Sequence, residues 1–328
     1  MSRRPASAAR IIARRLAALP FVLLAVAALT FGLIAISPFD ATSAYTGIGG
    51  TLSEQTRQEI NAAWGLDGSM LQHFGQWLGN VARGDLGHSR LLAGQPVAGE
   101  IAARALPSLV LVATALILVL VVGLVLGVLA AAFRDSPLDW VVRTLSYYGT
   151  AAPSFWVGLL LLYVFSLQLG WLPSGGSIDA HSSESGFIDP VHLILPAVTL
   201  AITQQSYFTL YVRDTMLEVL RDDHVRFAEA SGVRRFAVLT RHALPNALLP
   251  FITLTGSHLS ELIGGAVLAE TIFGWPGVGR LSVEAALAVD IPLLVGITLA
   301  GSVLVVFGNL VADLLYRVAD PRIREAVA

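Results

Sequence analysis

A polar stretch, residues 221–250 (RDDHVRFAEASGVRRFAVLTRHALPNALLP), interrupts a chain that is otherwise mostly apolar. Its arginines and carboxylates suit charged contacts with another protein surface. Covalent catalysis would instead need a nucleophile with an adjacent base and an orienting group, and the sequence gathers no such set. We therefore expect contact with another protein rather than bond-making chemistry from this stretch. A plain amphipathic loop is the alternative.

A single carboxylate, Glu261, lies within an apolar run of the sequence. A charged group inside a membrane helix is costly, so such a residue is a functional candidate by default. Glu261 either faces a translocation pathway and meets a substrate amine, or it has a structural partner such as His258, one turn away. A third alternative is that the boundary of the apolar span is misplaced. Gln204, Gln205, Tyr207 and Tyr211 share an earlier apolar run, where polar side chains line a pathway or bond to neighbouring helices.

Several kinds of chemistry are excluded by composition. The seven histidines lack an HExxH or comparable ligand spacing, and the chain has no cysteine, so we expect no metal site. All 21 basic residues are arginine. Without lysine the chain cannot complete a P-loop or form a Schiff base. We expect no enzyme activity and no cofactor in this chain, and any ATP that drives it must be hydrolysed by another chain.

The composition indicates a multi-pass membrane protein. The chain is 55% apolar and 13% charged, whereas soluble domains carry roughly 25% charged residues. A net charge of −2 argues against nucleic acid as a partner. We expect an all-α fold with six transmembrane helices, the first an uncleaved signal anchor because it exceeds the length of a signal-peptide core. The expected spans are residues 11–36, 106–133, 138–169, 191–220, 247–272 and 291–318.

Arginine placement predicts the orientation. With the N-terminus inside, cytoplasmic segments hold 16 arginines and external segments hold five. The positive-inside rule therefore places both termini and residues 221–250 in the cytoplasm. The resulting division is an N-tail and first helix (1–36), an external loop (37–104), a five-helix core (105–318) with a cytoplasmic loop at 221–246, and a cytoplasmic tail (319–328).

Local signals predict where several helices begin and bend. Ser136-Pro137 and Asp189-Pro190 each place a cap residue before a proline in the first turn. Pro153 and Pro196 fall inside expected spans, where a kink is tolerated. In the external loop, Thr51 and Glu54 form a capping box for a helix through Trp64. A second amphipathic helix is expected over residues 70–81, and both either pack on the membrane or dock a partner.

Residues 221–246 predict two short helices. Asp222 and Asp223 favour a helix start, and Gly232 favours its end. The second helix is expected to stop at Pro245, with Arg234 and Arg235 off its apolar face. That face comprises Val233, Phe236, Ala237, Thr240 and Leu244.

Five stretches resemble the permease subunits of ABC importers, in the branch that takes peptides, nickel and related solutes. Ala228, Gly232 and the HALPNALLP run (242–250) are similar to the cytoplasmic "EAA" loop of these subunits, with Arg226 where the name-giving glutamate is often found. The other stretches are GLD (65–67) with GDLGHS (84–89), Arg213 before TMLEVL, ETIF with WPGVG (270–279), and Asp313, Tyr316 and DPRIR (320–324). The family usually has an arginine where Val289 precedes Asp290.

The resemblance implies a type I ABC importer permease fold in the bacterial plasma membrane. It implies a pore shared with a second, homologous permease, two ATPase subunits that carry ATP and Mg, an external solute-binding protein, and contact with membrane lipids. The expected function is import of di- and oligopeptides by alternating access. Nickel chelates, glutathione or another small solute are alternative substrates, and an ion-coupled secondary transporter is a less favoured alternative because one glutamate is little support for ion sites.

The resemblance also implies roles for particular residues. Ala228 and Gly232 are expected to let the helix pair sit close to an ATPase, while charged neighbours make polar contacts. The expected ATPase-coupling residues are Arg226, Ala228, Glu229, Gly232, Arg234, Arg235, His242 and Pro245. The expected pathway residues are Glu261, Gln204, Tyr207, Tyr211 and Glu270.

Overall fold

A computed structural model describes residues 8–36, 53, 55, 70–177 and 189–319. Within these ranges every named element is a helix. The chain divides into two compact units, which are described separately. Unit one contains the described residues of Met1–Ile12, Leu109–Trp275 and Phe307–Ala328, and unit two those of Ala13–Ser108 and Pro276–Val306.

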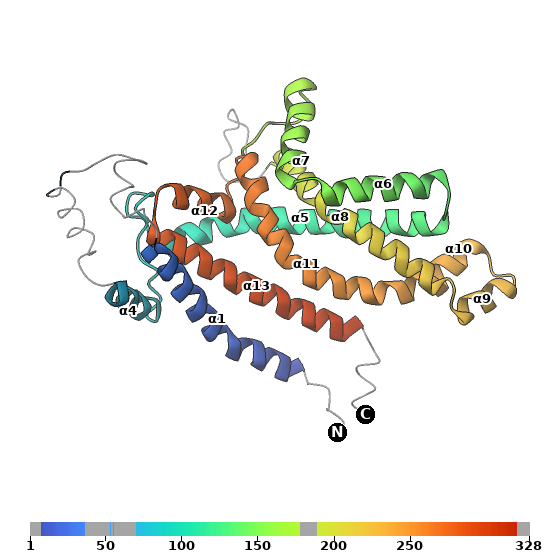
Figure 1. The fold of residues 1–328 in the computed structure, drawn as a ribbon, viewed down its shortest axis with the longest axis horizontal. Helices are drawn as coiled ribbons and strands as arrows, with labels where there is room; N and C mark the ends of the chain where they lie inside the picture. The colour runs from blue at the N-terminus through green and yellow to red at the C-terminus, as the bar shows by residue number, and fades with distance from the viewer. Residues whose placement is uncertain (1–7, 37–52, 54, 56–69, 178–188, 320–328) are drawn as a thin grey trace. The chain divides into compact units, whose positions relative to one another are not determined.

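Unit one is a bundle around α8 (Figure 1). Its helices are α5 (Val97–Ala132, from Leu109 onward), α6 (Pro137–Ala151), α7 (Ser154–Leu161) with the π-helical η1 (Leu162–Gln168), α8 (Pro190–Val219), α9 (Asp223–Ala230), α10 (Arg235–Ala237), the π-helical η2 (Val238–Ala243) and α11 (Leu244–Ile272). Unit two contains α1 (Ala8–Ile36, from Ala13), α4 (Met70–Val81), the start of α5, α12 (Val278–Leu287) and most of α13 (Ile291–Ala319).

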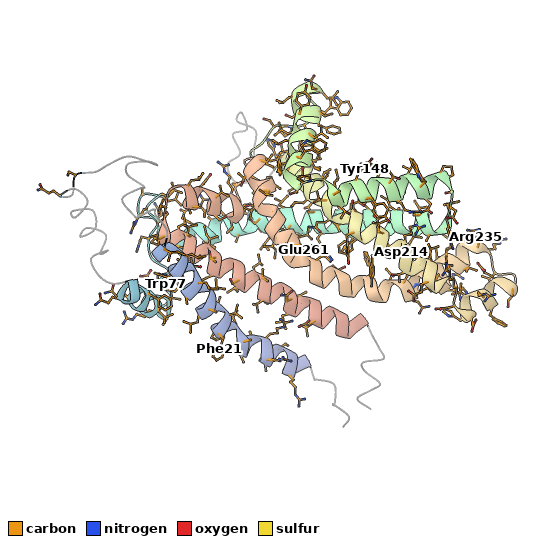
Figure 2. The ribbon with its side chains drawn as sticks, in the orientation of Figure 1. Phe21, Trp77, Tyr148, Asp214, Arg235 and Glu261 are labelled. Carbon is orange, nitrogen blue, oxygen red and sulfur yellow. The ribbon has the colours of Figure 1, made fainter. Side chains whose placement is uncertain are left out.

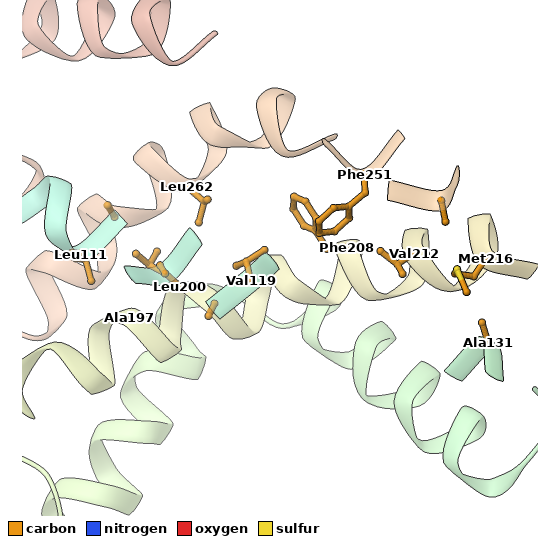
Figure 3. Close-up of a cluster of buried hydrophobic side chains, with 14 of the residues drawn as sticks. Leu111, Val119, Ala131, Ala197, Leu200, Phe208, Val212, Met216, Phe251 and Leu262 are labelled. Atoms are coloured by element: carbon orange, nitrogen blue, oxygen red, sulfur yellow. The ribbon is translucent and has the colours of Figure 1, made fainter. Parts of the chain in front are cut away.

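The core of unit one forms where α8 meets its neighbours. Phe208, Val212 and Met216 of α8 are at most 1% exposed and belong to one apolar cluster with side chains of α5 and α11 (Figure 3). Their spacing of four residues places them on one face of α8. Burying this face fixes α8 as the helix against which the others pack.

Glycines allow the helices to approach α8 closely. A Cβ atom at Gly123 of α5 would lie 2.8 Å from the Cβ of Phe208, and one at Gly127 would lie 2.6 Å from the Cβ of Val212. Small residues four apart are the usual device for close helix packing in membranes. On α6, Gly149 plays the same part, because a Cβ there would overlap the hydroxyl of Ser206. Helices α5 and α6 therefore pack closely against α8 at these glycines.

Four described helices are long and apolar enough to cross a membrane: Ile12–Leu33, Val97–Ala132, Pro190–Val219 and Ile291–Val311. A fifth span results if α6 and the α7–η1 segment are counted together. These helices support a multi-pass membrane protein. The sixth expected span, residues 247–272, lies within α11, which is a continuous helix but is not among the spans just named. Its crossing of the membrane stays a prediction.

The expected span over residues 138–169 is not one straight helix. It breaks between α6 and α7, and the two parts are bent by 109° (Figure 1). Ala152 and Pro153 at the break both have extended backbone, with ψ near 130°. The ring of a proline disfavours helical backbone in the residue before it, so the expected kink at Pro153 is a full break. Pro196, in contrast, is accommodated inside α8.

Other local predictions are confirmed. The Ser136 hydroxyl accepts a hydrogen bond from the Asp139 backbone N–H at the start of α6, and the Asp189 carboxylate accepts one from Val191 at the start of α8. The amphipathic helix expected over residues 70–81 is α4. The capping box at Thr51 and the helix through Trp64 lie outside the described residues.

Unit two is packed around the start of α5 and α13. Helix α5 begins at Val97, earlier than the sequence suggested, because Val97 is fully buried against Leu281 and Leu293. Elsewhere in unit two, the Phe31 ring of α1 meets Phe74 of α4 edge-on and Trp77 at a tilt, with centroids 5.2 and 5.3 Å away. Phe74 and Trp77 of α4 are therefore partly buried against α1, whereas Leu78 is exposed.

Candidate functional site

Helix α9 ends in a left-handed turn at Gly232. The Gly232 N–H donates to the Glu229 carbonyl at 3.0 Å, and the Val233 N–H donates to the Ala228 carbonyl at 3.2 Å. This pair of bonds is the Schellman ending, and it needs the positive φ of 81° that Gly232 adopts. The predicted helix end is confirmed. A Cβ at Gly232 would meet open space, so the requirement is backbone conformation rather than room.

The predicted stop at Pro245 is wrong. α10, η2 and α11 follow one another without a break from Arg235 to Ile272, and Pro245 lies in the first turn of α11. In η2 the hydrogen-bond ladder widens, and the Leu244 N–H donates to the Leu239 carbonyl five residues back. A proline lacks a backbone N–H to donate. Pro245 follows the transition from the π-helical η2 to the α-helical α11, where one missing hydrogen-bond donor is tolerated.

The π turn also moves the buried face of this segment. The buried side chains are Val238, Ala243, Ala247 and Phe251, at spacings of five, four and four residues. The α-helical spacing assumed from the sequence placed Phe236 on the apolar face, but Phe236 is 76% exposed. That prediction was wrong: the buried face passes through Val238 and Ala243, whose five-residue spacing across the π turn is not one that an α-helical pattern contains.

The inner side of α9 is part of the core of unit one. Val225 is fully buried and Ala228 is 6% exposed, and Val225 belongs to the same apolar cluster as Met216 of α8. Ala228 therefore packs within this chain, and its expected role beside an ATPase stays a prediction. Residues 223–243, here called the coupling element, are consequently packed into the core of the bundle.

Polar bonds fasten the coupling element at its edges. Arg235 donates through Nη2 to the carbonyl of Ala132, at the end of α5. The Nε2 atom of His224 on α9 lies 3.2 Å from Nδ2 of Asn246 on α11. The carbonyls at a helix C-terminus lack partners within the helix and attract cations. The coupling element is therefore joined to α5 and α11 as well as to α8.

A buried ion pair joins α6 to α8 close to the coupling element. Arg213 donates from Nε to Asp139 Oδ1 at 2.6 Å and from Nη2 to Asp139 Oδ2 at 2.9 Å. The side chains are 11% and 1% exposed. The Asp135 N–H also donates to Asp139 Oδ2. Sequence reasoning missed the pairing of Asp139, although two opposite charges near the ends of two apolar runs were a usable signal.

The outer face of the coupling element carries charged and aromatic side chains. Phe227 and Phe236 are 75% and 76% exposed, and Arg226, Glu229 and Arg234 are exposed beside them. Figure 2 labels Arg235 at this end of the molecule. Exposed aromatic residues with charged neighbours are typical of protein interfaces. Phe227 escaped sequence reasoning, although an aromatic residue between charges on a polar helix was the signal. Of the other expected residues, His242 is half-buried and Pro245 is exposed.

The pathway residues expected from the sequence only partly come together. Glu261 and His258 on α11 and Tyr207 on α8 form one cluster, and the position of Glu261 is labelled in Figure 2. Gln204 and Tyr211 are half-buried on α8. Glu270 is fully buried within unit one, and its place on a pathway stays a prediction. Across the described ranges, no group of three or more His, Asp or Glu could hold a metal ion.

In unit two, Asp290 bonds to one of the stretches noted in the sequence. Its Oδ2 atom accepts hydrogen bonds from the Ser89 hydroxyl at 2.7 Å and from the Leu91 N–H at 2.9 Å. Asp290 is completely buried. The loop GDLGHS (84–89) is thereby fixed to the start of α13. Val289, which precedes Asp290, has a positive φ of 52°.

Comparison with known proteins assigns the chain to a family. Residues 123–325, which include the whole coupling element, match the family described as binding-protein-dependent transport system inner membrane component. The chain belongs to this family. The permease is 39% identical over 317 residues to the oligopeptide transport system permease protein AppB of Bacillus subtilis, covering 96% of this chain and 99% of that one.

Two further comparisons agree. A putative peptide transport system permease protein of Brucella abortus is 42% identical over 314 residues, 96% of this permease and 98% of the relative. A solved chain of the MetNI methionine ABC transporter, from a study of inward-facing conformations, matches with a TM-score of 0.56 and 15% identity. That match covers 67% of the permease and 96% of the solved chain, and at this identity it shows the fold alone. The permease therefore has the fold of an ABC importer membrane subunit.

Proposed function

We propose that this chain is the permease subunit of an ATP-driven importer of di- and oligopeptides in the bacterial plasma membrane. The relatives of similar length are named for peptide transport. In this proposal the chain crosses the membrane six times, with α11 as one of the spans, and both termini are cytoplasmic. It lines the pathway with a second, homologous permease, and an external solute-binding protein delivers the peptide.

The coupling element is the observation that carries the proposal. Its inner side is built into the bundle through Val225 and Val238, and Arg235 holds it to α5. Its outer side exposes Phe227 and Phe236. To transmit force from a partner protein to the membrane helices, a subunit needs an exposed contact surface that is joined rigidly to those helices. We infer that two partner ATPases, carrying ATP and Mg, bind this surface.

Transport then follows from rigid-body motion. When the ATPases close on nucleotide, the coupling element moves with them, and α8 and α11 move with the coupling element because they share its buried core. Such a motion opens the pathway alternately to each side of the membrane. This chain contributes no bond-making step, since hydrolysis takes place on the partners.

Purification and reconstitution test the proposal. The chain, isolated in mild detergent, is expected to bring down a second permease, two P-loop ATPases and a solute-binding protein. In proteoliposomes containing this assembly, vanadate is expected to stop peptide uptake, whereas collapse of the proton gradient is expected to leave it unchanged. The reverse pattern would instead establish an ion-coupled transporter.

A further inference from the structure

One ionisable cluster lies at the middle of α11. Fourteen residues of the helix precede His258 and fourteen follow it. The His258 Nδ1 atom lies 2.8 Å from Glu261 Oε2, one turn further on. The His258 side chain is 14% exposed and that of Glu261 is 58% exposed. The carboxylate therefore stands at the surface of the chain while the imidazole is held beneath it.

Aromatic rings of α8 and α11 hold the imidazole in place. The Tyr207 ring centroid is 4.6 Å from that of His258, and the Phe208 ring meets the imidazole edge-on at 5.5 Å. Phe208 in turn packs against Phe251. The imidazole is thus confined between two rings, and its Nδ1 atom fixes the carboxylate. Tyr207 is 43% exposed, and its ring contacts the same imidazole that bonds the carboxylate.

Such an exposed carboxylate is costly unless a cation or water meets it. A charged side chain at the centre of a membrane helix is energetically unfavourable, and such residues face a cavity or a partner rather than lipid. Helix α11 contains no arginine or lysine. Its own helix therefore offers Glu261 no permanent cation.

We propose that Glu261, Tyr207 and His258 form an ammonium-binding site on the translocation pathway, which receives the amino terminus of the peptide. The inference rests on the proposed function. The ammonium group donates to the Glu261 carboxylate, and the face of the Tyr207 ring attracts the same positive charge. His258 acts as a positioning residue that orients the carboxylate. One carboxylate and one ring bind an ammonium weakly enough to release it, as a pathway site must.

The absence of cysteine from this chain permits a direct test. Glu261→Cys is reconstituted with its partner subunits, and peptide uptake is measured before and after treatment with charged methanethiosulfonate reagents. The unmodified variant is expected to import peptide roughly tenfold more slowly, because a charge-assisted hydrogen bond is lost. A sulfonate reagent, which restores negative charge, is expected to recover most of the uptake. A trimethylammonium reagent of similar size is expected to recover none.

Three results would overturn the site: wild-type uptake by unmodified Glu261→Cys, equal uptake after both reagents, or failure of both water-borne reagents to label the cysteine. The wild-type assembly is treated in parallel, since any effect there comes from partner thiols. Tyr207→Phe, which keeps the ring, is expected to import peptide faster than Tyr207→Leu, which removes it. If the cysteine variant is poorly folded, Glu261→Asp and Glu261→Gln make the same comparison of charge. An assembly whose wild type imports no peptide would instead refute the proposed function.

Discussion

The ion pair between Asp139 and Arg213 makes a quantitative prediction. Asp139→Asn removes the negative charge and leaves the guanidinium of Arg213 largely buried, with its side chain 11% exposed. Leaving one partner of a buried pair uncompensated costs about 3–5 kcal/mol. Arg213 keeps one contact, from Nη1 to the exposed Asp214 carboxylate at 2.9 Å. We therefore expect a loss of about 3 kcal/mol in the free energy of unfolding, at the lower end of that range.

Denaturant titration in mild detergent measures this loss, and a double-mutant cycle isolates the pair. Arg213→Met is expected to be similarly destabilising, because it leaves the buried Asp139 carboxylate without the two hydrogen bonds donated by the guanidinium. The double variant should recover part of the loss, since apolar replacement of both partners is often neutral. Asp135→Asn provides a matched control, because the Arg134–Asp135 pair is exposed, at 49% and 73%, and such pairs contribute about 1 kcal/mol or less.

Two outcomes would refute this reasoning. One is a cost for Asp139→Asn no larger than that for Asp135→Asn. The other is strict additivity of the two single changes in the cycle, which would mean that the charges do not interact. A functional measurement accompanies the stability measurement: because the pair holds α6 to α8 next to the coupling element, Asp139→Asn should also lower the amount of peptide imported per ATP hydrolysed.

Three further predictions concern backbone and packing. Gly232→Val should uncouple ATP hydrolysis from peptide uptake without preventing membrane insertion, because valine disfavours the positive φ at this position. Gly232→Asn is the control and should import peptide, since asparagine tolerates positive φ. Normal uptake by Gly232→Val would contradict this. Gly127→Leu should lower the free energy of unfolding by about 1–3 kcal/mol, because the added side chain overpacks against α8. Denaturant titration in mild detergent measures this loss. Gly99→Leu on the same helix is the control, since a side chain there meets open space, and it should not destabilise the permease. Asp290→Ala should speed hydrogen exchange at the Leu91 amide, and unchanged exchange would refute the role of that carboxylate.

Much of the local structure could be predicted because its causes are local. The caps at Ser136 and Asp189 and the end of α9 at Gly232 each depend on hydrogen bonds that reach only a few residues along the chain. The amphipathic spacing that predicts α4 is local in the same sense. These features need no knowledge of which helices meet.

The site was only partly predictable, because its geometry depends on distant partners. The polar stretch was identified, but its buried face was misplaced, since η2 shifts the register in a way that no α-helical pattern expresses. Ala228 was assigned to an interface because its small size suits one, yet the bundle buries it. The contact between His258 and Glu261 was foreseen as an alternative, because one helical turn separates them, whereas the nearness of Tyr207 was not.

The sequence by itself determined that the chain is apolar enough for a membrane, that it lacks the lysine of a P-loop, and where several helices begin and end. Those properties follow from composition and short-range bonding. Tertiary structure alone decided that Arg213 meets Asp139, that Ser89 meets Asp290, and that α5 begins at Val97. Each of these depends on which helix faces come together, and that is determined by burial over the whole unit rather than by neighbouring residues.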